Sequence, residues 1–186
     1  MKPTEPTHIE TDWVVVTGAP SSGKTTTVQA LSETLMRPVR AEIATMVIRR
    51  RIQLGRTLVE ATADQHGLQQ EIFLEGGRSE DGLPHDVPHI LDRGWPDVIA
   101  YELLYSGGRA EQWLHQVANA RRRYRQVFRL DRLPFEDNDV RVDGAVADQL
   151  HELYGYVYTR LGYEVVDVPV LPVADRAAFI AECLRA

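Results

Sequence analysis

Lysine is almost absent from this 186-residue sequence, in which Lys2 and Lys24 are the two lysines. Nearly all the positive charge is therefore arginine, whose planar guanidinium binds phosphates and carboxylates well. Codon bias is an alternative explanation of this excess. The formal net charge is −6, and affinity for nucleic acids depends on cations that neutralise phosphates. We therefore expect no nucleic-acid partner.

Features of membrane-bound and secreted proteins are also lacking. No apolar run approaches the ~20 residues that cross a bilayer, so no membrane partner is expected. Residues 1–11 lack the apolar core of a secretory signal, and their Pro and Thr content predicts a mobile N-terminal lead. Cys183 is the single cysteine and cannot form an internal disulfide, which fits a reducing compartment. We expect a cytoplasmic protein.

Two binding signatures are missing as well. The six histidines have no spacing typical of a zinc site. No N-K-x-D segment, with which regulatory GTPases identify guanine, occurs in the sequence. A dedicated GTPase switch is therefore disfavoured, although a protein can recognise guanine in other ways.

Strand-like and helical patterns alternate along the chain, which is typical of βαβ units that build a parallel sheet. The expected strands are residues 13–18, 37–42, 89–92, 126–130 and 164–170. The expected helices are residues 24–35, 43–55, 57–77, 95–108, 110–124, 143–163 and 173–186, the third of which would end at the glycine pair 76 and 77. No linker or repeat interrupts this order, so we expect one α/β domain over residues 1–186.

The first strand leads into a loop of small residues that matches the pattern G-x-x-x-x-G-K-[ST]. Small side chains let backbone N–H groups converge on a polyphosphate, and the N-terminus of the following helix adds partial positive charge. Lys24 would reach the β- and γ-phosphate oxygens, and the Thr25 hydroxyl would bind Mg²⁺. The expected nucleotide-binding residues are Gly18, Ala19, Pro20, Ser21, Ser22, Gly23, Lys24, Thr25 and Thr26.

A chance glycine-rich turn is the alternative, but the loop follows a strand and opens a helix, as the motif requires. The sequence therefore predicts a three-layer P-loop NTPase with about five mostly parallel strands flanked by helices. ATP with Mg²⁺ is the expected cofactor, and GTP is the other candidate nucleotide.

A second group of polar residues follows the expected third strand, in the segment HILDRGWPD. Asp92 at the strand end could bind the Mg²⁺ together with Thr25, or accept a proton from a hydroxyl. Arg93 would neutralise phosphate charge, while Asp97 and Tyr101 share one face of the next helix and could position an acceptor. A helix cap and a core-edge aromatic are the alternatives for Asp97 and Tyr101.

These motifs resemble the NadR-like AAA/P-loop domain family, which is close to small-molecule and nucleoside kinases. The similarity covers most of the chain, including VVVTGAPSSGKTT, LDRGWPDVIAY, RLPFEDNDVR and the C-terminal YTRLGYEVVDVPVLPVADRAAFI. The family pattern D-R-G-x-x-D-x-x-A-Y is matched by Asp92, Arg93, Gly94, Asp97, Ala100 and Tyr101. The resemblance implies an acidic residue after the second strand, which is Glu42 in this chain, and an arginine at the position occupied by Thr45.

The polar loop after the expected fourth strand resembles the D-x-x-R lid of that family, with Asp139 or Asn138 before Arg141. Residues of about 131–142 are therefore expected to form a small lid that excludes water during transfer. Arg129 and Arg132 flank the same loop, and solvated ion pairs are the alternative explanation of these arginines. The basic run at 121–125 is expected at a helix end.

The resulting hypothesis is an ATP- and Mg²⁺-dependent phosphotransferase acting on a small hydroxylated metabolite or nucleoside. Its catalytic residues would be Lys24, Asp92, Arg93 and Arg141, its metal ligands Thr25 and Asp92, and its acceptor-binding residues Glu42, Asp97 and Tyr101. The alternative is an NTP-binding or NTP-hydrolysing module that acts through a partner protein. A homodimer is a candidate assembly of this protein.

Overall fold

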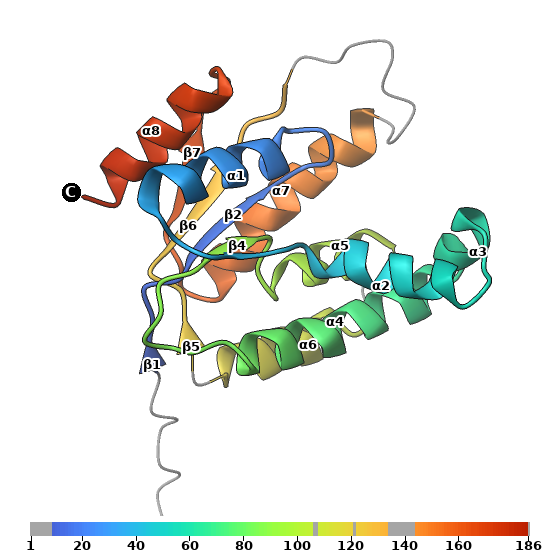
Figure 1. Cartoon of the computed structure of the whole chain (residues 1–186). Helices are drawn as coiled ribbons and strands as arrows, with labels where there is room; N and C mark the ends of the chain where they lie inside the picture. The colour runs from blue at the N-terminus through green and yellow to red at the C-terminus, as the bar shows by residue number, and fades with distance from the viewer. Residues whose placement is uncertain (1–8, 106–107, 121, 134–143, 186) are drawn as a thin grey trace, which may run out of the picture.

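A computed structural model of the chain describes residues 9–105, 108–120, 122–133 and 144–185, and shows a central parallel sheet between helical layers (Figure 1). Five strands form this sheet in the order β3-β4-β2-β6-β7. Their bounds are Val14–Gly18 for β2, Val39–Arg40 for β3, Ile90–Asp92 for β4, Gln126–Leu130 for β6 and Val165–Val168 for β7. All neighbouring pairs are parallel, so the α/β fold class predicted from the sequence is confirmed.

Strand β2 is the middle strand of the sheet, and both of its faces are buried. Val14 and Val16 belong to a core that includes residues of helices on one side of the sheet, whereas Val15 packs with Trp13 and Tyr158 on the other side. Alternate residues of a strand point to opposite faces, so a run of valines fills both cores. The loop that follows β2 is therefore anchored in the buried core of the domain.

Helices α1 (Lys24–Leu35) and α8 (Val173–Cys183) pack together on one face of the sheet. Helix α7 (Gly144–Arg160) contacts the opposite face and lies against α5 (Asp97–Tyr105). The remaining helices are α2 (Ile43–Gln53), α3 (Leu58–Ala63), α4 (Gln65–Asp81) and α6 (Ala110–Ala118). In Figure 1, α2, α3 and α4 extend away from the sheet beside α5, and side chains of α4, α5, α6 and α7 share one core.

The helix expected at 57–77 is two helices, so this prediction was wrong. Asp64 separates α3 from α4, and its carboxylate accepts a hydrogen bond from the Gly67 N–H at the start of α4. Gly76 and Gly77 lie inside α4, which continues to Asp81. Trp95 packs on both glycines: a Cβ atom at either position would lie 2.9 Å from an indole carbon.

The helix expected at 110–124 ends at Ala118, and residues 122–123 form the short strand β5. Strand β5 pairs in parallel with β1 (Ile9–Glu10), so the basic run is not at a helix end and the last part of the expected N-terminal lead is paired. Most of the expected lid, residues 134–142, lies outside the described residues. None of the helices in the described ranges is long and apolar enough to span a membrane.

Candidate functional site

The loop between β2 and α1 has an unusual backbone conformation. Gly18, Ser21 and Gly23 all have positive φ angles, of 147°, 61° and 78°. At Gly18 a Cβ atom would lie 3.0 Å from the carbonyl oxygen of Leu130, so a side chain there would be crowded as well as strained. The loop then enters α1 without a side-chain cap at its N-terminus. The first-turn N–H groups of α1 therefore remain available to an anion.

Lys24 lies beneath this loop with 8% of its surface exposed. Its Nζ atom donates a 2.8 Å hydrogen bond to the carbonyl oxygen of Ala19, at the other end of the loop. Burial and the positive charge of Arg93 lower the pKa of Lys24 from 10.5 to about 7. The lysine is thus held where the loop closes, in surroundings that favour its protonated form once a nearby anion is bound.

Thr25 and Asp92, the expected metal ligands, lie next to each other. The Thr25 hydroxyl donates a 3.1 Å hydrogen bond to Asp92 Oδ2, whereas no described residue is a hydrogen-bond partner of the buried Oδ1 of the same carboxylate. Burial and the nearby charge of Glu42 raise the pKa of Asp92. A hydroxyl beside an unsatisfied carboxylate oxygen is a donor set that fits Mg²⁺.

Arg93 follows Asp92 in a left-handed conformation, with φ of 67°. Its Nε donates to Glu42 at 2.6 Å, and its Nη1 donates to Tyr154 at 2.6 Å and to Asp97 at 3.2 Å. The guanidinium also lies 5.1 Å from the ring centre of Tyr154. Among the described residues, no hydrogen-bond partner occupies Nη2, so this nitrogen is the donor left for a ligand.

Asp97 lies at the beginning of α5, where both of its carboxylate oxygens accept hydrogen bonds from the protein. Oδ1 accepts from Thr17 and Arg93, and Oδ2 accepts from the Gly94 N–H at 2.8 Å and from Tyr158 at 2.5 Å. These contacts match the helix-cap alternative for Asp97. The carboxylate joins β2, the turn after β4 and α7.

A cavity of about 270 Å³ opens beside this turn, between α2, α4 and α5. Glu42, Arg93, Asp97 and Tyr101 line it, so the expected acceptor-binding residues are brought to one cavity together with Arg93. Most of the remaining wall is apolar or amide, with Ile43, Ile48, Leu68, Ile72, Val98, Trp95, Gln65 and Gln69. The Nε1 atom of Trp95 is buried without a hydrogen-bond partner.

Glu42 stands at the entrance of this cavity and also lines a wider groove with Thr25 and Asp92. The Thr45 hydroxyl donates to it at 2.7 Å, and Arg93 donates to its other oxygen. Burial alone would raise the pKa of Glu42, but the charge of Arg93 and the Thr45 hydrogen bond lower it. Position 45, where the resemblance implied an arginine, thus contributes a neutral hydrogen bond to Glu42, and the positive charge beside Glu42 belongs to Arg93.

A buried ion pair that no sequence pattern indicated supports the turn after β4. Arg40 donates to Glu80 at 2.9 Å and to the carbonyl oxygen of Arg93 at 2.7 Å. Glu80 also accepts from the Trp95 N–H and from the Tyr124 hydroxyl. Neither residue belongs to a recognisable motif. Their hydrogen bonds nevertheless stabilise the strained conformation of Arg93.

The arginines that flank the expected lid have partners outside the phosphate-binding loop. Arg129 donates to both oxygens of Asp167, at 2.6 and 3.0 Å, and Arg132 pairs with Asp148. Arg141, the remaining expected catalytic residue, lies outside the described residues.

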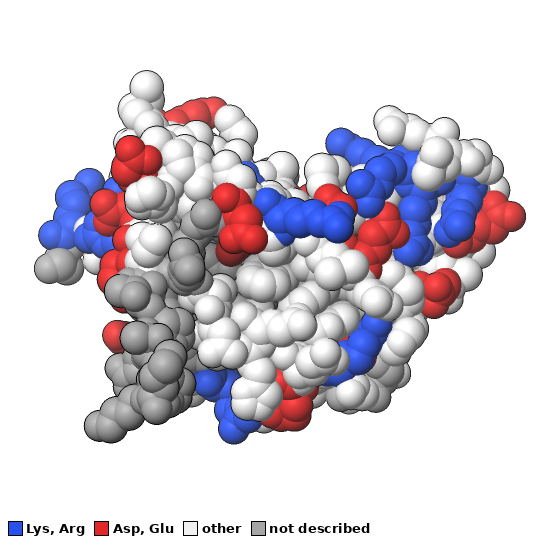
Figure 2. Space-filling view, turned by 90° about the horizontal axis from the view of Figure 1, so that it is seen from below, with Lys and Arg blue, Asp and Glu red and all other residues white. Residues whose placement is uncertain are grey.

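Figure 2 shows basic side chains gathered at the end where α2 and α3 lie, with acidic side chains among them. Arg50 and Arg51 of α2, for example, both pair with Glu71.

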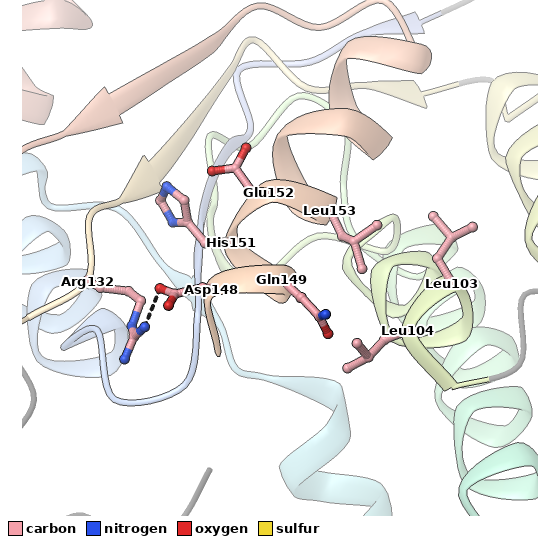
Figure 3. A pocket seen from close by; sticks show the side chains of 8 residues that line it. All are labelled: Leu103, Leu104, Arg132, Asp148, Gln149, His151, Glu152 and Leu153. Atoms are coloured by element: carbon pink, nitrogen blue, oxygen red, sulfur yellow. Dashed lines mark hydrogen bonds and ion pairs between the residues drawn. The ribbon is translucent and has the colours of Figure 1, made fainter. Parts of the chain in front are cut away.

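A hollow of about 770 Å³ lies between α5 and α7 (Figure 3). The residues of α5 that line it, Leu103 and Leu104, are not among those that line the 270 Å³ cavity. Leu103, Leu104 and Leu153 form its apolar side, whereas Asp148 is engaged with Arg132. No residue of the phosphate-binding loop is among the described residues that line it.

His151, at the edge of this hollow, lies with Asp131 and Asp167 in a group whose ligand atoms are within 4.8 Å of one another. Asp167 is already neutralised by Arg129. Burial and the same Arg129 lower the pKa of His151. We interpret the group as an ion-pair network.

Comparison with known proteins agrees with the fold. The sequence profile of the AAA domain family matches residues 13–176, and no curated protein sequence matches the chain. The structure of NadR protein in complex with NR is 16% identical, with a TM-score of 0.67 over 95% of this chain and 50% of the NadR chain. The chain thus spans about half the length of that protein.

Two further solved structures align over nearly their whole length. Deoxyadenosine kinase from M. mycoides with bound dCTP is 12% identical, with a TM-score of 0.62, and the alignment covers 93% of this chain and 98% of the kinase. Thymidylate kinase from Candida albicans is 16% identical, with a TM-score of 0.58, covering 94% of this chain and 91% of the kinase. The P-loop kinase fold and the family resemblance of the motifs are therefore confirmed. The chain belongs to the AAA domain family of P-loop proteins.

Proposed function

We propose that this protein is an ATP- and Mg²⁺-dependent phosphotransferase whose acceptor is a small hydroxylated molecule, a nucleoside or another metabolite. The observation that supports this proposal is the 270 Å³ cavity beside the turn that bears Asp92 and Arg93. An NTPase that acts through a partner protein needs the phosphate loop but no second enclosed cavity next to it. GTP is the alternative phosphoryl donor.

The residues of the loop would bind the triphosphate through backbone N–H groups, with Lys24 on the β- and γ-phosphates. Thr25 and Asp92 would hold Mg²⁺, which supplies charge neutralisation and orients the phosphates when it is bound. Alternatively, Asp92 would accept the proton of an acceptor hydroxyl on Oδ1, which has no hydrogen-bond partner among the described residues. Catalysis would rest mainly on positioning and on charge stabilisation.

Arg93 would contribute through Nη2, directed to the transferring phosphoryl group, while its other nitrogens stay bonded to Glu42, Asp97 and Tyr154. Glu42 and Tyr101 would contact the acceptor. Asp97 has both oxygens engaged by protein donors, so its role would be to fix Arg93 and the start of α5. Arg141 and the lid at 131–142 remain predictions from the sequence.

The ion pairs in the cavity restrict the class of acceptor that can bind. Both of its cations are paired: Arg93 with Glu42 and Asp97, and Arg40 with Glu80. A phosphate or carboxylate on the acceptor would therefore meet carboxylates without a free cation among the described lining residues. We expect an acceptor without an anionic group.

The test is ADP release from Mg·ATP by the whole chain in the presence of a panel of hydroxylated acceptors. Nucleosides, their 5′-monophosphates and simple polyols would be compared at equal concentration. The proposal predicts that at least one uncharged or cationic acceptor raises ADP release well above the basal rate, with a phosphorylated product visible by mass spectrometry. ATP hydrolysis that no acceptor changes would favour the partner-dependent module.

A further inference from the structure

Arg176 of α8 is an arginine in an unfavourable place. Only 1% of its surface is exposed, and it lies in the first turn of a helix, where the helix dipole repels a cation. Its Nε and Nη2 atoms are buried and have no hydrogen-bond partners in the part of the chain that the structure describes. Within the described residues, no carboxylate forms an ion pair with it. Burying a charge with so few partners is costly unless another contact offsets the cost.

Among the described residues, the hydrogen-bond partner of Arg176 belongs to the phosphate-binding loop. Nη1 donates to the carbonyl oxygen of Ser22 at 2.6 Å. The contact with the next residue is also close, since a Cβ atom on Gly23 would lie 3.4 Å from the same nitrogen. The guanidinium therefore lies directly behind the last residues of the loop, on the side of α8.

This contact orients the peptide between Ser22 and Gly23. In a planar trans peptide the C=O and the N–H point in opposite directions. Because the Ser22 carbonyl is held toward α8, the Gly23 N–H must point away from α8, toward the concave side of the loop. The neighbouring Ser21 has a φ angle of 61°, which is a conformation that a residue with a side chain adopts only when its surroundings support it.

We propose that Arg176 is a positioning residue of the nucleotide site: it fixes the Ser22–Gly23 peptide and places behind the polyphosphate a positive charge that forms no ion pair with a described carboxylate. This inference rests on the proposed nucleotide binding, but it holds equally for a kinase and for a hydrolysing module. A charge in a buried, low-dielectric position acts strongly over one backbone thickness. Its effect should therefore increase with the number of phosphates on the ligand.

The test compares the binding of Mg·ATP, Mg·ADP and AMP by calorimetry to the parent chain and to R176Q and R176K. Gln retains a hydrogen-bond donor without the charge, and Lys retains the charge. We expect R176Q to weaken Mg·ATP binding at least about tenfold, Mg·ADP less and AMP within about twofold, whereas R176K should bind Mg·ATP within about threefold of the parent.

A matched control is R125Q. Arg125 also donates to a backbone carbonyl at 2.6 Å, but this carbonyl belongs to Leu184, just beyond the other end of α8. R125Q should bind all three nucleotides within about twofold of the parent. A thermal melt of each variant separates loss of folding from loss of affinity.

The inference is overturned if folded R176Q binds Mg·ATP like the parent, if AMP and ATP lose affinity equally, or if Gln and Lys have equal effects. If R176Q does not melt cooperatively, R176K alone tests the inference. A loss of Mg·ATP affinity of more than about threefold in R176K then refutes the role of the charge. A parent chain that binds no nucleotide would instead refute the proposed function.

Discussion

The hydroxyl of Thr25 donates a 3.1 Å hydrogen bond to Oδ2 of Asp92, which joins the first turn of α1 to the end of β4. Strands β4 and β2 are neighbours in the sheet, with Val16 opposite Asp92. The carboxyl ends of parallel strands are where α/β proteins bind ligands. The phosphate loop and the carboxylate are therefore brought together by strand pairing, although they are 67 residues apart in the sequence.

The first prediction concerns this carboxylate. We expect D92N to lower Mg²⁺-dependent ATP turnover at least about 100-fold, because an amide has neither the charge for Mg²⁺ nor the basicity to accept a proton. ADP release would be measured over a Mg²⁺ titration. D167N is the matched control, since Asp167 is a half-exposed carboxylate paired with Arg129 outside the nucleotide loop, and its turnover should be unchanged. Full turnover by D92N would contradict the assignment.

The second prediction follows from the pKa of Lys24, which burial and the charge of Arg93 lower to about 7. A bound triphosphate favours the ammonium form and raises this pKa again. Above about pH 7, Mg·ATP binding should therefore take up a proton, and affinity should fall by as much as about tenfold per pH unit. Calorimetry in buffers of different ionisation enthalpy measures the uptake.

Lys24 also predicts a pH dependence of stability. Since its pKa is about 7 when folded and 10.5 as a model group, the unfolded chain binds the extra proton between these values. The contribution of this residue to the free energy of unfolding should therefore rise from about pH 7 to 10.5. K24M should remove that rise and the proton uptake together. A variant that retains both would show that another group titrates.

Asp97 provides the third prediction, on stability. Its buried carboxylate accepts from Thr17, Arg93, Gly94 and Tyr158, so D97N would place an amide N–H₂ against donors. We expect the free energy of unfolding to fall by about 3 kcal/mol, measured by urea denaturation. The control D167N breaks a largely exposed pair and should cost about 1 kcal/mol or less. Equal losses in the two variants would contradict this role of Asp97.

The parts of the site that depend on local pattern could be predicted from the sequence. The phosphate loop was among them because its function requires small residues at fixed spacing between a strand and a helix. Asp92, Arg93 and Asp97 could be placed because strand ends of a parallel sheet meet at one edge. The five-stranded sheet followed from the alternation of elements.

Residues that act through tertiary contacts were missed. Arg40 and Glu80 meet only after β3 and α4 have packed, and no spacing in the sequence indicates that contact. Arg176 left a weak signal: it precedes Ala177, Ile180, Ala181 and Leu184, which all belong to one core, so it occupies the apolar face of α8. A charged residue on an apolar helix face is the pattern that could have indicated it.

The fourth prediction concerns Gly76 and Gly77 of α4. The sequence predicted that the helix would end at these two glycines, whereas α4 continues to Asp81. Glycine ends helices when only local propensity matters, but Gly76 and Gly77 leave room for the indole of Trp95. In G77A the new Cβ would lie 2.9 Å from the indole. Overpacking of this kind should lower the free energy of unfolding by about 1–3 kcal/mol, despite the better helix propensity of alanine.

G82A, at the C-terminal cap of the same helix, is the matched control. Gly82 has a helical φ of −81°, and the nearest atom to its Cβ would be a carbonyl oxygen at an ordinary 3.5 Å. Alanine should therefore fit and change stability by at most about 1 kcal/mol, in the stabilising direction. If the indole is the cause, the cost of G77A should shrink in a W95L background, because leucine removes the ring that the new Cβ meets. Urea denaturation of the parent, G77A, W95L and the double variant measures the coupling between the two substitutions. Strict additivity would show that Trp95 does not require the glycine, and the close approach of the indole would then not explain why α4 contains the pair.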